Sequence, residues 1–166
     1  MSYVSRKNIP ENTIEARSYQ TAIADSALSA NTLVVLPTGM GKTAVALLVA
    51  ADRIDTGKVL MLAPTKPLVE QHLRYFSKNL LLEEGDVVMF TGSTPSPKRV
   101  AAWNAARFVI ATPEVIKNDL IAGRYGLEEV SLLIVDECHR TVGNYAYVFI
   151  GHRYNETAAH PLVLGM

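Results

Sequence analysis

Three kinds of segment follow one another in residues Thr32–Ile54, TLVVLPTGMGKTAVALLVAADRI. The first five residues form a short apolar run, which favours a strand, and Lys42–Ile54 has the length and apolar content of a packed helix. Between them lies PTGMGKT (Pro37–Thr43), which is typical of a phosphate-binding loop in that position. The general pattern G-x-x-x-x-G-K-[ST] is met only in its second half, because Leu36 stands where the first glycine would be. The context nevertheless predicts nucleotide binding.

The residue types of this loop suit phosphate chemistry. Gly39 and Gly41 allow the backbone to curl so that its N–H groups face a β-phosphate, and Lys42 can neutralise the β- and γ-oxygens. The Thr43 hydroxyl can be a ligand of Mg²⁺. The residues predicted to bind the nucleotide here are Pro37, Thr38, Gly39, Met40, Gly41, Lys42 and Thr43.

Short apolar runs alternate with longer amphipathic segments along the rest of the chain. This alternation predicts an α/β domain with a mostly parallel sheet and helices on both faces. The expected strands are 32–36, 59–63, 87–90, 107–111, 132–135 and 161–164. The expected helices are 14–28, 42–54, 67–80, 97–106, 113–121 and 145–155, the first of them opened by Asn12 and Glu15 at capping-box spacing.

An acidic pair follows the fifth expected strand, where Leu132–Val135 runs into Asp136-Glu137-Cys138-His139. In such a Walker B arrangement, Asp136 would hold Mg²⁺ through water and Glu137 would act as the general base that polarises the attacking water. His139 is expected to form hydrogen bonds on the γ-phosphate side of the site. Together with Lys42 and Thr43, these residues predict an ATPase with Lys42, Asp136, Glu137 and His139 as its catalytic group.

The composition and net charge disfavour several other classes of protein. A chain of 166 residues is expected to fold as one domain, and its 16 Lys and Arg residues balance its 16 Asp and Glu residues. Nucleic-acid binding would therefore depend on local donors rather than on a general positive field. No apolar run is long enough to span a bilayer, and the single cysteine, Cys138, suits a reducing compartment. Zinc binding by Cys138 with His72, His139, His152 and His160 is disfavoured, because their spacing is unsuitable.

Several motifs together resemble those of a known family. RSYQ (17–20), PTGMGKT, APTKPLVEQH (63–72), TGS (91–93), ATPEVI (111–116) and DECHR (136–140) look like the first RecA-like domain of a superfamily 2 DExH helicase. Within that superfamily, VGNYAYVFI (142–150) resembles the archaeal Hef and Fanconi-anaemia-M-type translocases, which remodel forked and branched DNA. The DECH tetrapeptide departs from the DEAH usual in that branch and resembles innate immune RNA sensors and Dicer-like helicases.

The resemblance implies roles for further residues. Arg17 and Gln20 look like the element that recognises adenine. The residues that look like phosphate contacts to one nucleic-acid strand are Thr65, Lys66, Thr91, Gly92, Thr112 and Pro113. The implied function is the ATP-, Mg²⁺- and nucleic-acid-binding half of an ATP-dependent helicase or translocase that acts on forked or branched DNA. The alternative is an ATP-gated sensor of double-stranded RNA or an RNA helicase of the DECH type.

The resemblance also implies an incomplete enzyme. Residues 1–166 would form the first RecA-like domain, as a fragment that ends just before the motif after its last strand. The second RecA-like domain, which in that family supplies arginine fingers and is a partner in the ATP cleft, is expected to lie outside residues 1–166. The parent protein is expected to be an ATP-dependent helicase with a cytoplasmic, nucleoid-associated location, or a nuclear one in a eukaryote, and no membrane partner. The isolated piece is expected to show little or no turnover.

Two smaller features allow alternatives. Tyr145, Tyr147, Phe149 and Tyr154 are expected to pack in the core rather than to stack on bases, because stacking surfaces usually combine aromatic residues with a basic groove. Lys98 and Arg99 lie beside prolines and could contact nucleic acid or belong to a solvated loop.

Overall fold

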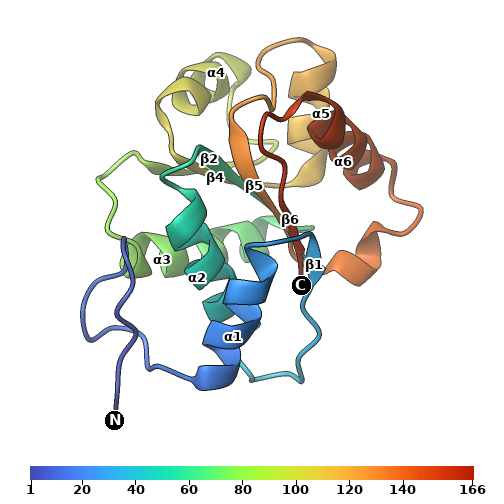
Figure 1. Ribbon diagram of the computed structural model, residues 1–166. Helices are drawn as coiled ribbons and strands as arrows, with labels where there is room; N and C mark the ends of the chain where they lie inside the picture. Colours follow the sequence, from blue (N-terminus) through green and yellow to red (C-terminus); the bar gives the residue numbers. More distant parts are fainter.

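The structure is a computed structural model that describes all 166 residues, and it contains one sheet of six parallel strands (Figure 1). The strand order in the sheet is β1-β6-β5-β2-β4-β3. The strands are β1 (Thr32–Leu33), β2 (Lys58–Leu62), β3 (Val87–Phe90), β4 (Phe108–Ala111), β5 (Val130–Val135) and β6 (Val163–Gly165). The α/β class with a parallel sheet is thus confirmed.

The chain also forms six α-helices and one short 3₁₀ helix, and all of them except α1 lie between strands. The α-helices are α1 (Ser18–Ala27), α2 (Lys42–Arg53), α3 (Lys66–Asn79), α4 (Ser96–Ala105), α5 (Pro113–Ile121) and α6 (Tyr145–Thr157). The 3₁₀ helix η1 spans Cys138–Thr141, directly after the acidic pair. None of these helices combines the length and the apolar character needed to cross a lipid bilayer.

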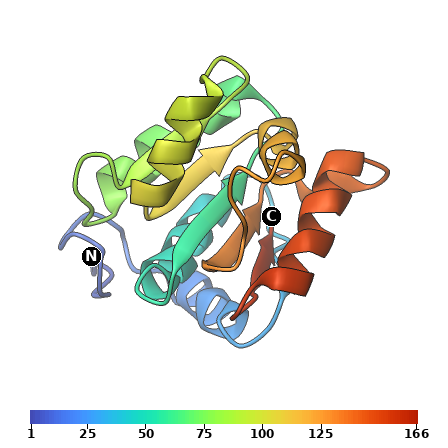
Figure 2. The same cartoon turned by 90° about the horizontal axis from the view of Figure 1, so that it is seen from above.

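The sheet is covered on both faces, as its nearly continuous apolar strands require. Successive residues of a strand point to opposite faces, so Val59 and Met61 pack with α1, α2 and α3, whereas Leu60 and Leu62 pack with α4, α5 and α6. Figures 1 and 2 show these two sets of helices on opposite sides of the sheet. The core is therefore divided into two layers with the sheet between them.

The predicted start of the first helix is wrong. The capping box at Asn12 and Glu15 does not form, and α1 begins only at Ser18. Before it, Glu15 pairs with Tyr3 in an antiparallel bridge, and the Val4 N–H donates to the Ile14 carbonyl at 2.8 Å. Asn12 itself has a φ of +60°, which is incompatible with the extended backbone of a capping residue.

All six expected strands are present, but the first is shorter than predicted. β1 ends at Leu33 rather than Leu36, and Val35 is 80% exposed because the chain leaves the sheet toward the phosphate loop. The Val34 N–H still donates to the Gly165 carbonyl at 2.8 Å. The end of β1 therefore remains attached to β6.

The aromatic residues of α6 lie largely where the sequence predicts. Tyr147 and Tyr154 are buried and Phe149 is half-buried, in agreement with core packing. Tyr145 is 65% exposed, so for this residue the prediction of a core position is wrong. It lies at the first turn of α6, where its ring is beside Lys117 rather than under the sheet.

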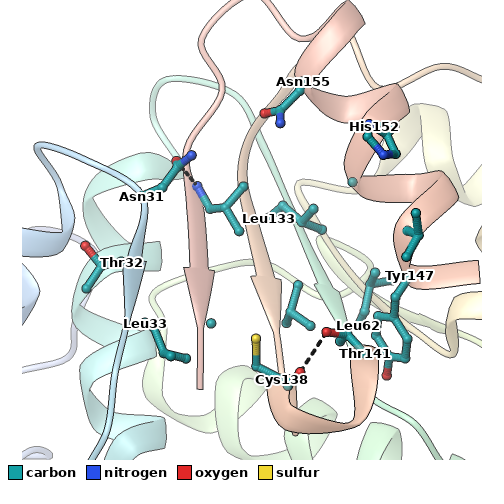
Figure 3. Close-up of a pocket in the computed structure, with 15 residues that line it drawn as sticks. Asn31, Thr32, Leu33, Leu62, Leu133, Cys138, Thr141, Tyr147, His152 and Asn155 are labelled. Carbon is teal, nitrogen blue, oxygen red and sulfur yellow. Dashed lines mark hydrogen bonds between the residues drawn. The ribbon is translucent and has the colours of Figure 1, made fainter. Parts of the chain in front are cut away.

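A groove of about 570 Å³ opens between α6 and β1, on the face that α4, α5 and α6 cover elsewhere. Figure 3 shows Leu33 on one side of this groove and Tyr147 and His152 on the other. Leu33 is 61% exposed there. This groove is separate from the phosphate loop, none of whose residues lines it.

Candidate nucleotide and nucleic-acid site

The predicted site residues divide the carboxyl edge of the sheet into two halves. Because all six strands are parallel, the loops that follow them lie along one edge, where ligands of doubly wound sheets bind. The phosphate loop follows β1 and the acidic pair follows β5, with β6 between these two strands. The candidate nucleic-acid residues follow β2, β4 and β3, which are adjacent. The fold thus separates the nucleotide candidates from the nucleic-acid candidates.

The phosphate loop has the backbone geometry that anion binding requires. Gly39 and Gly41 have φ values of +85° and +80°, in the left-handed region that glycine tolerates best. Gly41 begins α2 without a side-chain cap, and no acidic residue lies in the first turn. The N–H groups of Lys42, Thr43 and Ala44 have no acceptor within the protein. Such a helix start, with a lysine beside it, fits a phosphate group.

Gln20 on α1 contacts this loop directly. Its side-chain amide Nε2 donates to the Met40 carbonyl at 3.1 Å, and the Tyr19 hydroxyl donates to the same oxygen at 2.9 Å. Arg17 Nη1 in turn lies 3.4 Å from the Tyr19 hydroxyl. The sequence prediction included Arg17 and Gln20 but missed Tyr19, whose place in RSYQ was the available signal. Tyr19 and Gln20 of α1 therefore hold the phosphate loop, with Arg17 in contact with Tyr19, and adenine recognition stays a prediction.

The acidic pair adopts an unusual local conformation. Glu137 has a φ of +55°, and its N–H donates to Asp136 Oδ1 at 2.9 Å. The other oxygen of Asp136, Oδ2, lies 2.7 Å from Nε2 of His72, a residue of α3. Glu137 Oε2 lies 3.2 Å from Nε2 of His139, whose side chain is 73% exposed. Asp136 thus contacts the Glu137 N–H and the His72 ring, whereas His139 faces solvent beside the predicted general base.

The donor set fits a magnesium ion that is shared with a nucleotide. No group of three or more His, Cys, Asp or Glu side chains in the chain could hold a metal on its own. Mg²⁺ is commonly bound by one or two protein groups together with substrate phosphates and water. Asp136 and Thr43, each partly exposed, are candidates for those protein groups. Magnesium would supply charge neutralisation at the phosphates when bound.

One polar atom near the acidic pair has no partner. The hydroxyl of Tyr147 is buried and makes no hydrogen bond within the protein. Burial, and secondarily the charge of Asp136, raise the pKa of Tyr147 to about 12. The phenol therefore remains protonated and is available as a donor at neutral pH.

The candidate nucleic-acid residues differ in their exposure. Thr65, Lys66 and Gly92 are exposed and Thr112 is half-buried. Thr91 is only 3% exposed, and its hydroxyl is bonded to that of Ser93 at 2.9 Å. Pro113 is also buried. The exposed residues are therefore the ones that can contact a nucleic-acid strand directly. Thr91 and Pro113 are buried parts of the turns that carry them.

Both interpretations offered for Arg99 are wrong. Arg99 is 8% exposed, neither in a solvated loop nor available to nucleic acid, and it forms two hydrogen bonds with Asp119, Nε to Oδ2 at 2.7 Å and Nη2 to Oδ1 at 2.6 Å. It also donates to the Thr94 carbonyl, next to the TGS motif. Asp119 is fully buried and also accepts from Arg124 and Tyr125. Burial alone would raise the pKa of Asp119, but these hydrogen bonds outweigh it and lower that pKa.

Comparison with known proteins places these motifs in a family. The DEAD/DEAH box helicase family matches residues 17–155. This chain belongs to the DEAD/DEAH box helicases. Among the relatives of this helicase domain, the helicase domain of Hef from Pyrococcus furiosus is 48% identical, covers 95% of the chain and superposes with a TM-score of 0.92. The expected RecA-like fold and the resemblance to the Hef branch are thereby confirmed.

Relatives of the helicase domain include a Drosophila melanogaster protein named as an ATP-dependent DNA helicase, which is 41% identical over 82% of the chain, and others named differently. A Methanocaldococcus jannaschii protein whose name describes an ATP-dependent RNA helicase is 44% identical over 93% of the chain. The Fanconi anemia group M protein homolog of Mus musculus is 38% identical over 90% of the chain. The chain spans 20% of the length of the Methanocaldococcus jannaschii protein, 8% of the Mus musculus protein and 34% of the Hef chain.

Proposed function

We propose that this helicase domain is the ATP- and nucleic-acid-binding half of an ATP-dependent DNA helicase or translocase that acts on forked or branched DNA. The observation that carries the proposal is the division of the sheet edge between nucleotide and nucleic-acid motifs. Its similarity to the Hef helicase domain, at 48% identity, supports the choice of branch. The proposal includes a second RecA-like domain in the parent protein that closes the ATP cleft.

Each group then has one task. The free N–H groups at the start of α2 and Lys42 would bind phosphate oxygens, and Thr43 with Asp136 would bind Mg²⁺. Glu137 would accept a proton from the attacking water, with His139 beside its carboxylate. Thr65, Lys66, Gly92 and Thr112 would contact phosphates of one strand, which gives sequence-independent binding.

A second candidate is an RNA-directed enzyme or sensor. The DECH tetrapeptide at Asp136–His139 and the RNA helicase name of the Methanocaldococcus jannaschii relative favour it. The phosphate contacts proposed here do not discriminate DNA from RNA, because that distinction depends on contacts to the 2′-hydroxyl.

The deciding experiment compares ATP hydrolysis by the full-length protein in the presence of forked DNA, linear duplex DNA and double-stranded RNA. The DNA proposal expects the strongest stimulation by the fork, and the RNA candidate expects it from the double-stranded RNA. Two variants test the roles within the site. Lys42→Ala should lose turnover together with ATP affinity, whereas Glu137→Gln should lose turnover and still bind ATP. Stimulation by double-stranded RNA alone would overturn the DNA assignment.

A further inference from the structure

A histidine of α3 is joined to the predicted metal ligand. His72 Nε2 lies 2.7 Å from Asp136 Oδ2, and the two side chains are only 7% and 14% exposed. These residues are 64 positions apart in the chain. The contact therefore comes from the packing of α3 against the sheet and not from local geometry.

His72 stands in the apolar stripe of its helix. Val69 and Phe76 flank it at helical spacing, and both are completely buried. The His72 ring also packs beside Phe76, with 6.2 Å between the ring centroids. A polar ring in such a stripe is unfavourable unless it is hydrogen-bonded, and the Asp136 carboxylate is the partner that it has.

The bond fixes the orientation of the carboxylate. Oδ1 accepts from the Glu137 N–H and Oδ2 is paired with His72, so rotation of the Asp136 side chain would break both interactions. A carboxylate has about four lone-pair sites, so both oxygens can still accept a metal-bound water. Partners behind a ligand that hold it in place commonly change metal affinity by about 10–100-fold.

We propose that His72 is a positioning residue for the metal ligand: its Nε2–H holds Asp136 in the orientation that receives Mg²⁺ with the nucleotide. The inference rests on the proposed function, because it concerns the same ATP site. It adds to the ATP site a residue of α3, a helix that contains none of the predicted nucleotide-binding residues.

Two substitutions separate positioning from packing. His72→Phe keeps a ring beside Phe76 but has no hydrogen-bond donor, and His72→Gln has a donor at similar reach but no ring. The full-length protein is titrated with Mn²⁺, observed by electron paramagnetic resonance, in the presence of a non-hydrolysable ATP analogue. We expect His72→Phe to weaken Mn²⁺ binding by about tenfold or more, and His72→Gln to restore it toward the wild-type value. Binding of the analogue without metal should be the same in all three proteins.

The opposite order, with His72→Phe like the wild type and His72→Gln impaired, would assign His72 to packing alone and overturn the inference. A wild-type protein that binds no metal with the analogue would overturn the proposed function and this inference with it. The imidazole ¹⁵N signals of the wild type add a test that needs no variant. They should show a proton on Nε2 that responds to Mg²⁺ and the analogue, and an Nε2 without a proton would also overturn the inference.

Discussion

In the phosphate loop, Gly41 is the residue that tolerates a side chain least, because both its backbone conformation and its packing require glycine. Its φ is +80°, and a Cβ there would overlap the side-chain amide of Gln20. Gly39 has a similar φ of +85°, but a Cβ there would meet no atom within 4 Å. Alanine in the left-handed region costs about 1–2 kcal/mol at either position. Only at Gly41 must a neighbour also move.

The two glycines therefore provide a matched pair of variants. We expect Gly39→Ala to lower the free energy of unfolding by about 1–2 kcal/mol, and Gly41→Ala to lower it further because it displaces Gln20 from the Met40 carbonyl. Urea denaturation of both variants measures the difference. Equal losses at the two positions would mean that the Gln20 contact does not stabilise the loop.

Arg99 allows a second prediction at the same scale. Removing one partner of a buried ion pair leaves an uncompensated charge, which typically costs about 3–5 kcal/mol. Arg99→Met should destabilise the domain by less than that, about 1–3 kcal/mol, because the buried Asp119 loses two hydrogen bonds but keeps Arg124 and Tyr125 as partners. Lys98→Met is the matched control, because Lys98 is exposed on the same helix, and it should change the free energy of unfolding by less than about 0.5 kcal/mol. Thermal and urea unfolding are the measurements.

The lowered pKa of Asp119 makes this contribution pH-dependent. An acid whose pKa is lower in the native state stabilises that state fully above its unfolded pKa, about 3.9, and the stabilisation is lost as the pH falls through the native pKa. The wild type should therefore lose stability below about pH 4. Asp119→Asn should be less stable at pH 7 and lose less on acidification. Parallel pH profiles for the two proteins would contradict the assignment.

At the scale of helices and strands, two lysines of α3 allow a direct phosphate contact to be distinguished from an effect of overall charge. Lys66 lies at its start, among the candidate phosphate contacts, and Lys78 lies in its last turn. Lys66→Ala should weaken DNA binding similarly for all sequences and reduce the slope of log affinity against log salt by about 1. Lys78→Ala removes the same charge from the other end and should leave that slope unchanged. Fluorescence anisotropy over a salt series distinguishes the two.

Elements with a strong local signal could be predicted from the sequence, and those set by distant contacts could not. The six strands and the helices that alternate with them could be predicted from apolar periodicity. The phosphate loop could be predicted from its glycines and Lys42. The late start of α1 depends on the bridge between Tyr3 and Glu15, and no local sequence pattern predicts that bridge. The same is true of His72 and Arg99, whose partners lie 64 and 20 residues away. A polar residue within the apolar stripe of a helix is the sequence signal that points to such a buried contact.

At the scale of the whole molecule, the site forms one wall of the proposed ATP cleft. Arginine fingers from a second domain contribute about 10³–10⁵ in rate in related phosphoryl transfers. We therefore expect the isolated 166-residue chain to bind an ATP analogue while hydrolysing ATP slower by about that factor than the full-length protein. A coupled-enzyme assay of both, with and without DNA, measures the ratio. Comparable rates would show that the chain needs no second domain.

The position of β6 has a consequence for how the domain is assembled. β6 lies between β1 and β5 and pairs with both, and hydrogen bonds at its end extend these pairings: the Val34 N–H donates to the Gly165 carbonyl, and the Met166 N–H donates to the Val135 carbonyl. The phosphate loop and the acidic pair thus belong to strands that have no direct pairing with each other. During synthesis, which runs at about 5–20 residues per second, the hydrogen-bonded connection between these two strands can form only after β6 has left the ribosome. Most of residues 1–166 must therefore be made before the part of the ATP site that this domain contributes lies on one continuous sheet.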